Sequence, residues 1–554
     1  MKKRLLTVAA VALSFGLANA QDLAPVEWDI ITVKDPIQSA GFLDVKDLNG
    51  DGNLEIIHST LMEEGSAMDP STARGAIRTF SIGTDIYDDW NEDVVLPLSE
   101  ELPFLNDPQV FDVDEDGNPD ILIQQGFIRT NGGSHGWLKG PDFDEIHDFA
   151  PTTSHGNTDY IWHESVQLDL DGDGNLDIIT TSAQTQENGE DLDVVNAKIE
   201  WYRHLGNGEF EHYVINDSLG GVFIKMHDID GDGDMDIVVS QFFWGTDRPA
   251  LVWLEQVEAP AESNDWEGVW AYHEIDHTTG LGYAFQFYDL TGDGNEELVY
   301  VNHNNQDNGE IVDGDGNTIY PELCYFDIPS NPTEISQWTK HTIYDGFRAN
   351  LFDFGNPASQ GCPGIFDIGD VDGNGYADIV VPGDGNDTLY LFRQDENNVF
   401  HKEILDDDGK MYGMVKVADL DGNGEMEIVA SKHNFPEDFL EAIGGNPPGF
   451  LRIYKVYEAE DENPTSVNPF SNGELNVYPN PVSDNTLFID FNQEISTVVQ
   501  VNIFDMMGRL VFTKQVNTQG QAVLNLPQSL QSGQYIMNVT GDQTAITKQV
   551  VISR

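Results

Sequence analysis

The segment Asp169-Leu-Asp171-Gly-Asp173-Gly-Asn175-Leu-Asp177 is the clearest copy of a pattern that recurs along the chain. Its nine residues follow the rule Asp-x-Asp/Asn/Thr-x-Asp/Asn-Gly-x-x-Asp/Glu, which occurs seven times in the 554 residues. The copies begin at Asp47, Asp112, Asp169, Asp228, Asp289, Asp370 and Asp419, and successive starts are 65, 57, 59, 61, 81 and 49 residues apart. A quasi-regular period of this kind is typical of arrays and propellers, in which each repeat is one supersecondary unit.

Each copy has oxygen-bearing side chains at positions 1, 3, 5 and 9, and this spacing predicts a calcium site. Ca²⁺ takes about six to eight oxygen ligands, and a backbone carbonyl at position 7 can complete the set. Glycine at position 6 permits the sharp turn that brings the ligands together. The candidate ligand positions are Asp47, Asn49, Asp51, Asn53 and Glu55; Asp112, Asp114, Asp116, Asn118 and Asp120; Asp169, Asp171, Asp173, Asn175 and Asp177; Asp228, Asp230, Asp232, Asp234 and Asp236; Asp289, Thr291, Asp293, Asn295 and Glu297; Asp370, Asp372, Asn374, Tyr376 and Asp378; Asp419, Asp421, Asn423, Glu425 and Glu427. The sequence therefore predicts up to seven Ca²⁺ ions.

The EF-hand is the competing interpretation, because its calcium loop begins in the same way. It requires a bidentate Glu at position 12 and a helix on each side of the loop. Position 12 is occupied here by His58, Ile123, Thr180, Val239, Tyr300, Val381 and Ala430. None of these side chains is an acid, and the flanking runs, such as 54–57, 176–179 and 235–239, are short, apolar and β-branched. Each loop is therefore expected to join two antiparallel strands.

Two further strands are expected in each repeat. Segments 197–202, 250–254, 389–392 and 450–454 read as third strands, and segments 211–215 and 338–343 read as fourth strands. Seven repeats of four strands predict an all-β fold, a seven-bladed β-propeller over residues 22–457. The last blade has a third strand at 450–457 but no fourth, and segment 27–33 is a strand without a blade. The simplest closure of the ring has segment 27–33 completing the seventh blade.

These loops and strands resemble the FG-GAP/VCBS repeats of integrin α-chain propellers and of many secreted bacterial proteins. The resemblance covers about 27–457 and implies that the loop between the first two strands of a blade holds Ca²⁺. The match is tight in the second, third and fourth copies, which have carboxylates at positions 1, 3, 5 and 9. Asn49 and Thr291 replace the acid at position 3, and Asn374 and Asn423 replace it at position 5. A structural role for calcium is favoured over direct contact between an ion and a ligand, because the loops lie between strands in every repeat.

The charge balance excludes one class of partner. The chain has 26 basic and 97 acidic residues and a formal charge of −71. Nucleic acid is a poor partner for such a surface, since phosphate binding depends on Lys and Arg. The acidity is explained partly by cation binding and partly by a solvated surface that keeps a secreted protein soluble.

Residues 1–20 read as a secretory signal peptide. Lys2, Lys3 and Arg4 form a positive start, 5–17 is an apolar run, and Ala18-Asn19-Ala20 is a cleavage site that leaves Gln21 as the expected N-terminus. The apolar run is too short to span a bilayer, and no transmembrane segment is expected elsewhere.

An oxidising compartment permits a disulfide between Cys324 and Cys362, but their spacing does not decide it. Two further acidic stretches, 313–317 and 383–386, lack the full ligand set and are expected to form hairpin turns.

The C-terminal part differs in style. Residues 458–473 are polar and read as a linker, and 474–554 has shorter strands and no acidic loop, as expected for a small Ig-like β-sandwich. The segments 477–481 (VYPNP), 503–509 (IFDMMGR), 532–535 (SGQY) and 548–551 (KQVV) resemble the type A C-terminal sorting domain of type IX secretion. The resemblance implies a type IX secretion machinery partner, a secreted or outer-surface location, and no ligand chemistry in this domain.

Three classes of function remain open for the propeller, because a fold does not decide a function. The favoured hypothesis is a secreted or surface calcium-binding module that recognises polysaccharide, as an adhesin or glycan-binding protein. Its aromatic residues include Trp137, Trp162, Trp201, Trp244 and Trp253, most of which are expected in the core. A structural scaffold, which predicts a large exposed apolar patch, is a further alternative.

The enzyme alternative is a calcium-dependent polysaccharide lyase or sugar dehydratase. Such chemistry needs a base and a cation that neutralises a uronate carboxylate. Residues that precede the innermost strand of a blade are expected at one mouth of the ring, among them Asn106, Trp162, His163, Tyr283 and Tyr412. His163, Tyr283 and Arg348 are the candidates for base, acid and carboxylate clamp.

Overall fold

The structure is a computed structural model, and it divides the chain into two compact units, Met1–Tyr457 and Glu458–Arg554. It describes residues 3–5, 23, 26–61, 63–66, 69–87, 90–126, 132–154, 156, 158–188, 191–244, 248–304, 318–349, 361–407, 411–433, 448–457, 475–483, 485–491, 498–505, 510–517, 521–527, 530, 532–541 and 544–553. No helix within these ranges is both long and apolar enough to cross a membrane.

The first unit consists of antiparallel sheets. In its described residues, seven of these sheets each contain four strands that belong to the repeats. Six of them each come from one repeat: β3 (Ala40–Lys46), β4 (Glu55–Thr60), β7 (Ile77–Ile82) and β8 (Trp90–Leu96); β9 (Val110–Phe111), β10 (Asp120–Gln124), β11 (His135–Leu138) and β12 (Ile146–Asp148); β13 (Tyr160–Leu168), β14 (Asp177–Asn188), β15 (Asp191–His204) and β16 (Phe210–Asn216); β17 (Ile224–His227), β18 (Asp236–Ser240), β19 (Leu251–Glu258) and β20 (Val269–Asp276); β21 (Gly282–Tyr288), β22 (Glu297–Asn302), β23 (Leu323–Asp327) and β24 (Thr339–Tyr344); β25 (Asp367–Gly369), β26 (Asp378–Pro382), β27 (Leu389–Gln394) and β28 (Phe400–Asp406). We number these repeats 1 to 6 in that order.

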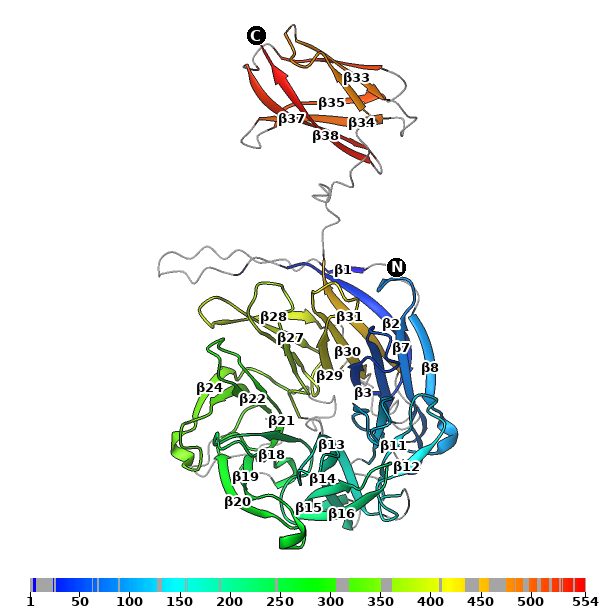
Figure 1. The fold of residues 1–554 in the computed structure, drawn as a ribbon, viewed down its shortest axis with the longest axis vertical. Coiled ribbons are helices and arrows are strands. Elements are labelled where there is room, and N and C mark those ends of the chain that lie inside the picture. Colours follow the sequence, from blue (N-terminus) through cyan, green and yellow to red (C-terminus); the bar gives the residue numbers. More distant parts are fainter. Residues whose placement is uncertain are drawn as a thin grey trace. The chain divides into compact units, whose positions relative to one another are not determined.

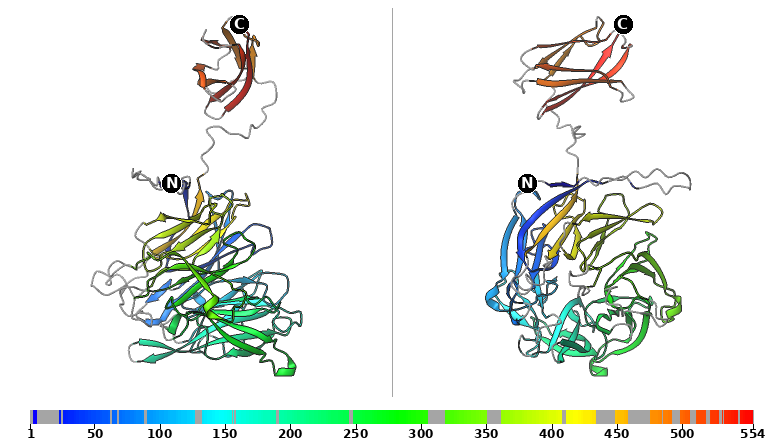
Figure 2. Two further views of the ribbon diagram at one scale, coloured as in Figure 1. Left: turned by 90° about the vertical axis from the view of Figure 1, so that its left-hand side faces the viewer. Right: turned by 180° about the vertical axis from the view of Figure 1, so that it is seen from behind.

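Repeat 7 closes the ring with a strand from the other end of the unit. Its sheet contains β29 (Met411–Ala418), β30 (Glu427–His433), β31 (Pro448–Val456) and β2 (Trp28–Gln38), and β2 pairs antiparallel with β31. The predicted closure by segment 27–33 is therefore confirmed. The seven sheets follow one another around a common centre in a propeller-like arrangement (Figures 1 and 2).

A fifth strand, β1 (Lys3–Leu5), pairs with β2. These three residues lie in the segment expected to be a signal peptide, so cleavage after Ala20 would remove this strand. The connections also hold a small hairpin of β5 (Glu64–Ser66) and β6 (Asp69–Arg74), and the short 3-10 helices η1 (Leu98–Glu100), η2 (Phe242–Trp244), η3 (Glu262–Asn264) and η5 (Ile335–Gln337).

The second strand of every repeat begins at position 9 of the acidic loop. In β10, β18 and β26 all five residues are buried, and the runs after the leading aspartate are Ile-Leu-Ile, Ile-Val-Val and Ile-Val-Val. Short β-branched runs of this kind are typical of strands that are covered on both faces. The flanking strands exclude the EF-hand, as the sequence predicted. The turn at 383–388 joins the antiparallel strands β26 and β27, which confirms that prediction too, whereas 313–317 lies outside the described residues.

The first strands of neighbouring repeats contact one another at the centre, for example β3 with β29 and β13 with β17. Their edges are joined by side chains that bind the neighbouring backbone. Asp44 accepts the N–H of Val110 at 3.2 Å, and Asp367 accepts that of Val417 at 2.8 Å. Three more links of this kind join repeats 2 to 3, 3 to 4 and 5 to 6: Ser165 N–H to Gln109, Ile224 N–H to Glu164, and Gln286 to the Phe366 carbonyl. These bonds satisfy strand edges that no ladder pairs.

Cys324 and Cys362 are both buried free thiols, so the disulfide that an oxidising compartment would permit is not formed. The second unit contains two sheets around one core. Its strands are β32 (Leu475–Tyr478), β33 (Thr486–Phe491) and β36 (Gln521–Asn525) in one sheet, and β35 (Leu510–Asn517), β34 (Val498–Asp505), β37 (Gly533–Gly541) and β38 (Thr544–Ile552) in the other. Both sheets contribute side chains to that core, among them Ile489, Ile503 and Met537. Strands throughout this unit agree with the all-β structure that the sequence predicted for 474–554.

Candidate metal sites and the inner-strand cluster

The acidic loop has the same backbone arrangement in all seven repeats. In repeat 3, Asp169 accepts the N–H of Gly174 at 3.0 Å, and Asp177 accepts the N–H of Leu170 at 3.0 Å. The bond from the position 6 glycine to the position 1 aspartate recurs in every repeat. The bond from the position 2 N–H to the position 9 carboxylate recurs as well. Position 6 has a positive φ, such as +95° at Gly174, which explains why this residue is glycine.

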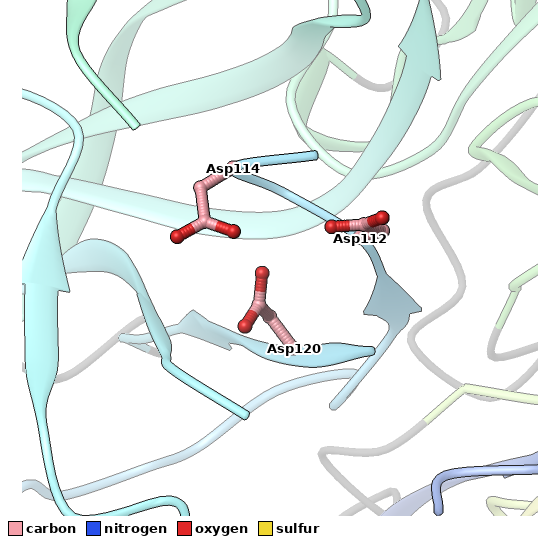
Figure 3. Close-up of side chains that lie close together, drawn as sticks. All are labelled: Asp112, Asp114 and Asp120. Carbon is pink, nitrogen blue, oxygen red and sulfur yellow. The ribbon is translucent and has the colours of Figure 1, made fainter. Parts of the chain in front are cut away.

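In five loops three carboxylates converge. Oxygen atoms from positions 1, 3 and 9 lie within 4.8 Å of one another in repeats 2, 3, 4, 6 and 7. The sets are Asp112, Asp114 and Asp120; Asp169, Asp171 and Asp177; Asp228, Asp230 and Asp236; Asp370, Asp372 and Asp378; and Asp419, Asp421 and Glu427. Figure 3 shows the carboxylates of Asp112, Asp114 and Asp120 turned toward one another. Hard oxygen ligands at this spacing fit the coordination preference of Ca²⁺.

Repeats 1 and 5 are built differently, because position 3 is not an acid. The Asn49 amide donates to Glu55 at 3.0 Å, and the Thr291 hydroxyl donates to Glu297 at 3.0 Å. The longer glutamate at position 9 thus reaches the polar side chain at position 3. These two loops offer an amide or hydroxyl oxygen where the other five offer a carboxylate.

Burial of the position 9 carboxylate shows in its pKa. Burial raises the pKa of Asp120, Asp177 and Asp236 to about 6, and that of Asp378 to about 7. A cation bound among these oxygens would favour the ionised form. The three converging carboxylates therefore fit Ca²⁺, while the position 5 side chain and the position 7 carbonyl stay predicted ligands.

A second set of charged side chains lies on or just before the first strands, and we call it the inner-strand cluster: Asp44, Asp107, Glu164, Lys225, Asp367 and Lys416. Lys225 binds Glu164 at 2.5 Å, and Lys416 lies 3.9 Å from Asp44. The Asp107 carboxylate is the exception, since its Oδ1 is buried and accepts no hydrogen bond. Burial raises its pKa to about 8. The sequence analysis did not identify this cluster.

The candidates for base and acid do lie in one region. His163 and Tyr283 both pack against Phe223, with ring centroids 5.3 and 4.9 Å apart, respectively. Burial lowers the pKa of His163 to about 4 and raises that of Tyr283 well above its usual value. His163 is therefore neutral at neutral pH, and Tyr283 stays protonated and is a weaker acid than an ordinary tyrosine.

Arg348 makes different contacts. Its guanidinium lies 4.6 Å from the ring centroid of Tyr320 and donates to the carbonyl of Asp345 at 2.9 Å. Tyr320 is 47% exposed and Arg348 is also exposed, so the pair offers an aromatic face beside a positive charge. Among the described residues, no hydrogen bond, ion pair or ring contact joins Arg348 to His163 or Tyr283.

Other residues expected at the mouth are structural. Asn106 donates to the carbonyls of Gly126 and Trp162, and the Trp162 indole donates to Glu200 at 3.1 Å. The side chains of Tyr412 and Trp244 lie outside the described residues. Trp137, Trp162, Trp201 and Trp253 are fully buried, as expected for core residues.

His303 and Asp384 are buried neighbours that the sequence analysis did not select as candidates. His303 Nδ1 lies 2.7 Å from the Pro363 carbonyl, its ring stacks on Tyr283 at 4.3 Å, and its Nε2 lies 3.8 Å from Asp384. The bond to a carbonyl places the proton on Nδ1. Asp384 belongs to the turn predicted as a hairpin, so its sequence context did not distinguish it.

Comparison with known families identifies both parts of the chain. The secretion system C-terminal sorting domain family matches residues 476–553, and the FG-GAP-like repeat family matches residues 169–239 and 370–430. The chain carries FG-GAP-like repeats and a C-terminal sorting domain. The sorting domain implies type IX secretion to the cell surface or the exterior. No curated protein sequence matches the chain.

Several solved structures resemble the chain at low identity. Rhamnogalacturonan lyase YesW has a TM-score of 0.38 and 13% identity over 78% of this chain and 72% of its own. The exotype rhamnogalacturonan lyase YesX has a TM-score of 0.41 and 15% identity over 78% and 73%. A fungal alcohol oxidase of the AA5 family has a TM-score of 0.42 and 10% identity over 96% and 100%. Likenesses this distant carry no argument about activity.

Proposed function

We propose that the chain is a secreted or cell-surface, calcium-binding, seven-bladed β-propeller that recognises an extracellular polysaccharide, as an adhesin or glycan-binding protein. The observation that carries the proposal is the combination of seven equivalent acidic loops with a type IX sorting domain. Calcium holds the loops between the first two strands of each blade, and up to seven ions stabilise the fold. The sorting domain is an address and an Ig-like β-sandwich without ligand chemistry.

Polysaccharide is the favoured ligand because Tyr320 and Arg348 form an exposed pair. A sugar ring can stack on the phenol face, and the adjacent guanidinium can bind a uronate or sulfate group. Both residues belong to the connections of repeats 5 and 6, at the end of the first strands that also carries Tyr283. An acidic glycan fits this pair better than a neutral one.

The alternative is a calcium-dependent polysaccharide lyase or sugar dehydratase. It is supported by the neutral imidazole of His163 and by the Tyr283 ring, which pack on the same Phe223 side chain. In this reading His163 removes the proton next to the uronate carboxylate and Tyr283 acts on the leaving group.

One experiment separates the two. The mature chain is titrated with acidic and neutral polysaccharides in Ca²⁺ and in EGTA, while binding and the ultraviolet absorbance of an unsaturated uronate are recorded. Binding without absorbance supports recognition, and Tyr320→Ala or Arg348→Gln should weaken it about tenfold. Tyr272→Ala is the matched control, because Tyr272 is 45% exposed on the outer strand β20. Growing absorbance that His163→Ala abolishes would support the lyase, and absence of any binding or turnover would refute both.

A further inference from the structure

The residue opposite position 9 on the third strand differs systematically among the repeats. Ile178 pairs with Tyr202 in repeat 3, so the preceding residue, Asp177, faces Arg203. The same register gives Lys139, Arg393 and Lys455 in repeats 2, 6 and 7. It gives Ser81, Glu255 and Asp327 in repeats 1, 4 and 5. Four loops therefore face a base and three do not.

The four bases bind the loop carboxylates directly. Arg203 contacts Asp171 at 2.5 Å and Asp173 at 2.8 Å. Arg393 contacts Asp372 at 2.5 Å. Lys139 binds Asp114 and Asp116, and Lys455 binds Glu427 at 2.5 Å and Asp421 at 3.2 Å. Each ammonium or guanidinium thus supplies positive charge at the oxygens of positions 3, 5 or 9.

Repeat 4 is the exception among the five loops whose carboxylates converge. It has the three-carboxylate set of Asp228, Asp230 and Asp236, and acids also at positions 5 and 7 of the loop. Its cross-strand residue, Glu255, adds a further carboxylate. The Nε2 atom of His273 lies 2.7 Å from this carboxylate. Repeats 1 and 5 also lack a base, but they lack the position 3 carboxylate as well. Repeat 4 alone combines a complete acidic ligand set with no built-in cation among the described contacts.

We propose that Lys139, Arg203, Arg393 and Lys455 act as fixed counter-cations that replace part of the metal's charge, and that the repeat 4 loop is the primary, tightest divalent-cation site. This inference rests on the proposed calcium-binding function. A fixed positive charge beside a loop repels Ca²⁺ and so lowers the affinity of that loop for the ion. The same charge reduces the repulsion among the carboxylates when no ion is bound. Loops with a base therefore keep their shape at low calcium, whereas the repeat 4 loop depends on the ion.

The test is a calcium titration of the full mature chain by isothermal titration calorimetry, with the melting temperature recorded at each calcium level. The wild-type protein should show one tight site that is separated from weaker ones by about tenfold or more, the effect expected of one nearby charge. Glu255→Arg should remove the tight site. Arg203→Gln should create a second tight site in repeat 3 and lower the melting temperature in EGTA only.

Glu258→Arg provides the matched control, because Glu258 is exposed near the end of the same strand and the substitution makes the same charge change. It should alter the calcium affinity by less than about twofold, as expected for a more distant, screened charge. Several equal sites in the wild-type protein, or weaker calcium binding by Arg203→Gln, would overturn the inference while leaving calcium binding intact. Absence of any calcium binding would overturn both the inference and the proposed calcium function. Far-ultraviolet circular dichroism checks that each variant is folded. Glu255→Gln removes only the negative charge, and it should lower the calcium affinity of the tight site as Glu255→Arg does, but by less.

Discussion

Asparagine in place of Asp107 should stabilise the first unit near pH 8 and leave its stability near pH 4 almost unchanged. Asp107 precedes β9 and is 6% exposed, and its Oδ1 accepts no hydrogen bond. Burial raises the pKa of this carboxyl from 3.8 to about 8. Lys416 and Lys225 favour the ionised form, while Asp44 and Glu164 oppose it, so the facing charges counteract one another and burial decides the direction.

The sign and size of the effect follow from proton linkage. In the unfolded chain the carboxyl loses its proton near pH 4, whereas the folded protein keeps it until about pH 8. The folded state therefore binds more protons between these values, and the free energy of unfolding falls as the pH rises through this window. One pKa unit corresponds to about 1.4 kcal/mol, so the gap has an upper bound of about 6 kcal/mol. Because the side chain can turn toward Lys416 or water, we expect about 2 kcal/mol, a fraction of that bound.

The assay is urea unfolding of wild type and Asp107→Asn at several pH values, in saturating calcium so that the loops stay constant. The two stability curves should diverge above about pH 4 and run parallel again above the pKa of the folded state, which is about 8 for the full gap and correspondingly lower for an effect of about 2 kcal/mol. Asp142→Asn, at an exposed site, is the control and should follow the wild-type curve. Parallel curves across the whole range, or a variant that is less stable near pH 8, would refute the reasoning.

Three further perturbations test other parts of the structure. Tyr454→Phe removes the hydroxyl that donates to Asp406 at 2.6 Å, and should lower the free energy of unfolding by about 1–2 kcal/mol in urea titrations; an unchanged midpoint would contradict that bond. Gly174→Ala has no steric conflict within 4 Å but a φ of +95°, so calorimetry should show a loss of about 1 kcal/mol from backbone strain, and no loss would mean that the loop adopts another conformation. Deletion of 458–554 should leave the melting temperature of the first unit unchanged, since the two units are separately compact; a shift of several degrees would reveal a stabilising contact.

The loops and strands could be predicted because their information is local. In the pattern around Asp169, the glycine predicts the turn and the carboxylates predict the ligands. The apolar run that follows predicts the second strand. The role of β2 in closing repeat 7 could also be inferred, since one unassigned strand and one incomplete sheet remained. Both inferences need only spacing and periodicity along the chain.

The inner-strand cluster could not be predicted in this way. Asp44, Asp107 and Glu164 come from three successive repeats, and their partners are backbone groups or ammonium groups of other repeats. From the sequence alone, a carboxylate at such a position is predicted to be exposed to solvent. Its burial follows only from the contacts between strands of different repeats. The cross-strand bases were missed for a related reason: the connection between the second and third strands varies in length, so Lys139 and Arg203 occupy no constant offset from their loops.

The direction of the first strands limits what an ion in the loops can do. His163 precedes Asp169 by six residues on and beyond β13, and Tyr283 precedes Asp289 by six residues on and beyond β21. Six residues of extended chain span about 20 Å. An ion held by these loops is therefore far beyond contact with a sugar that reaches His163 or Tyr283, and it cannot neutralise the carboxylate of a uronate there. If the chain is a lyase, that charge must be met by a side chain at the same end, such as Arg348. Any calcium bound in the loops would then act on either function through the stability of the ring.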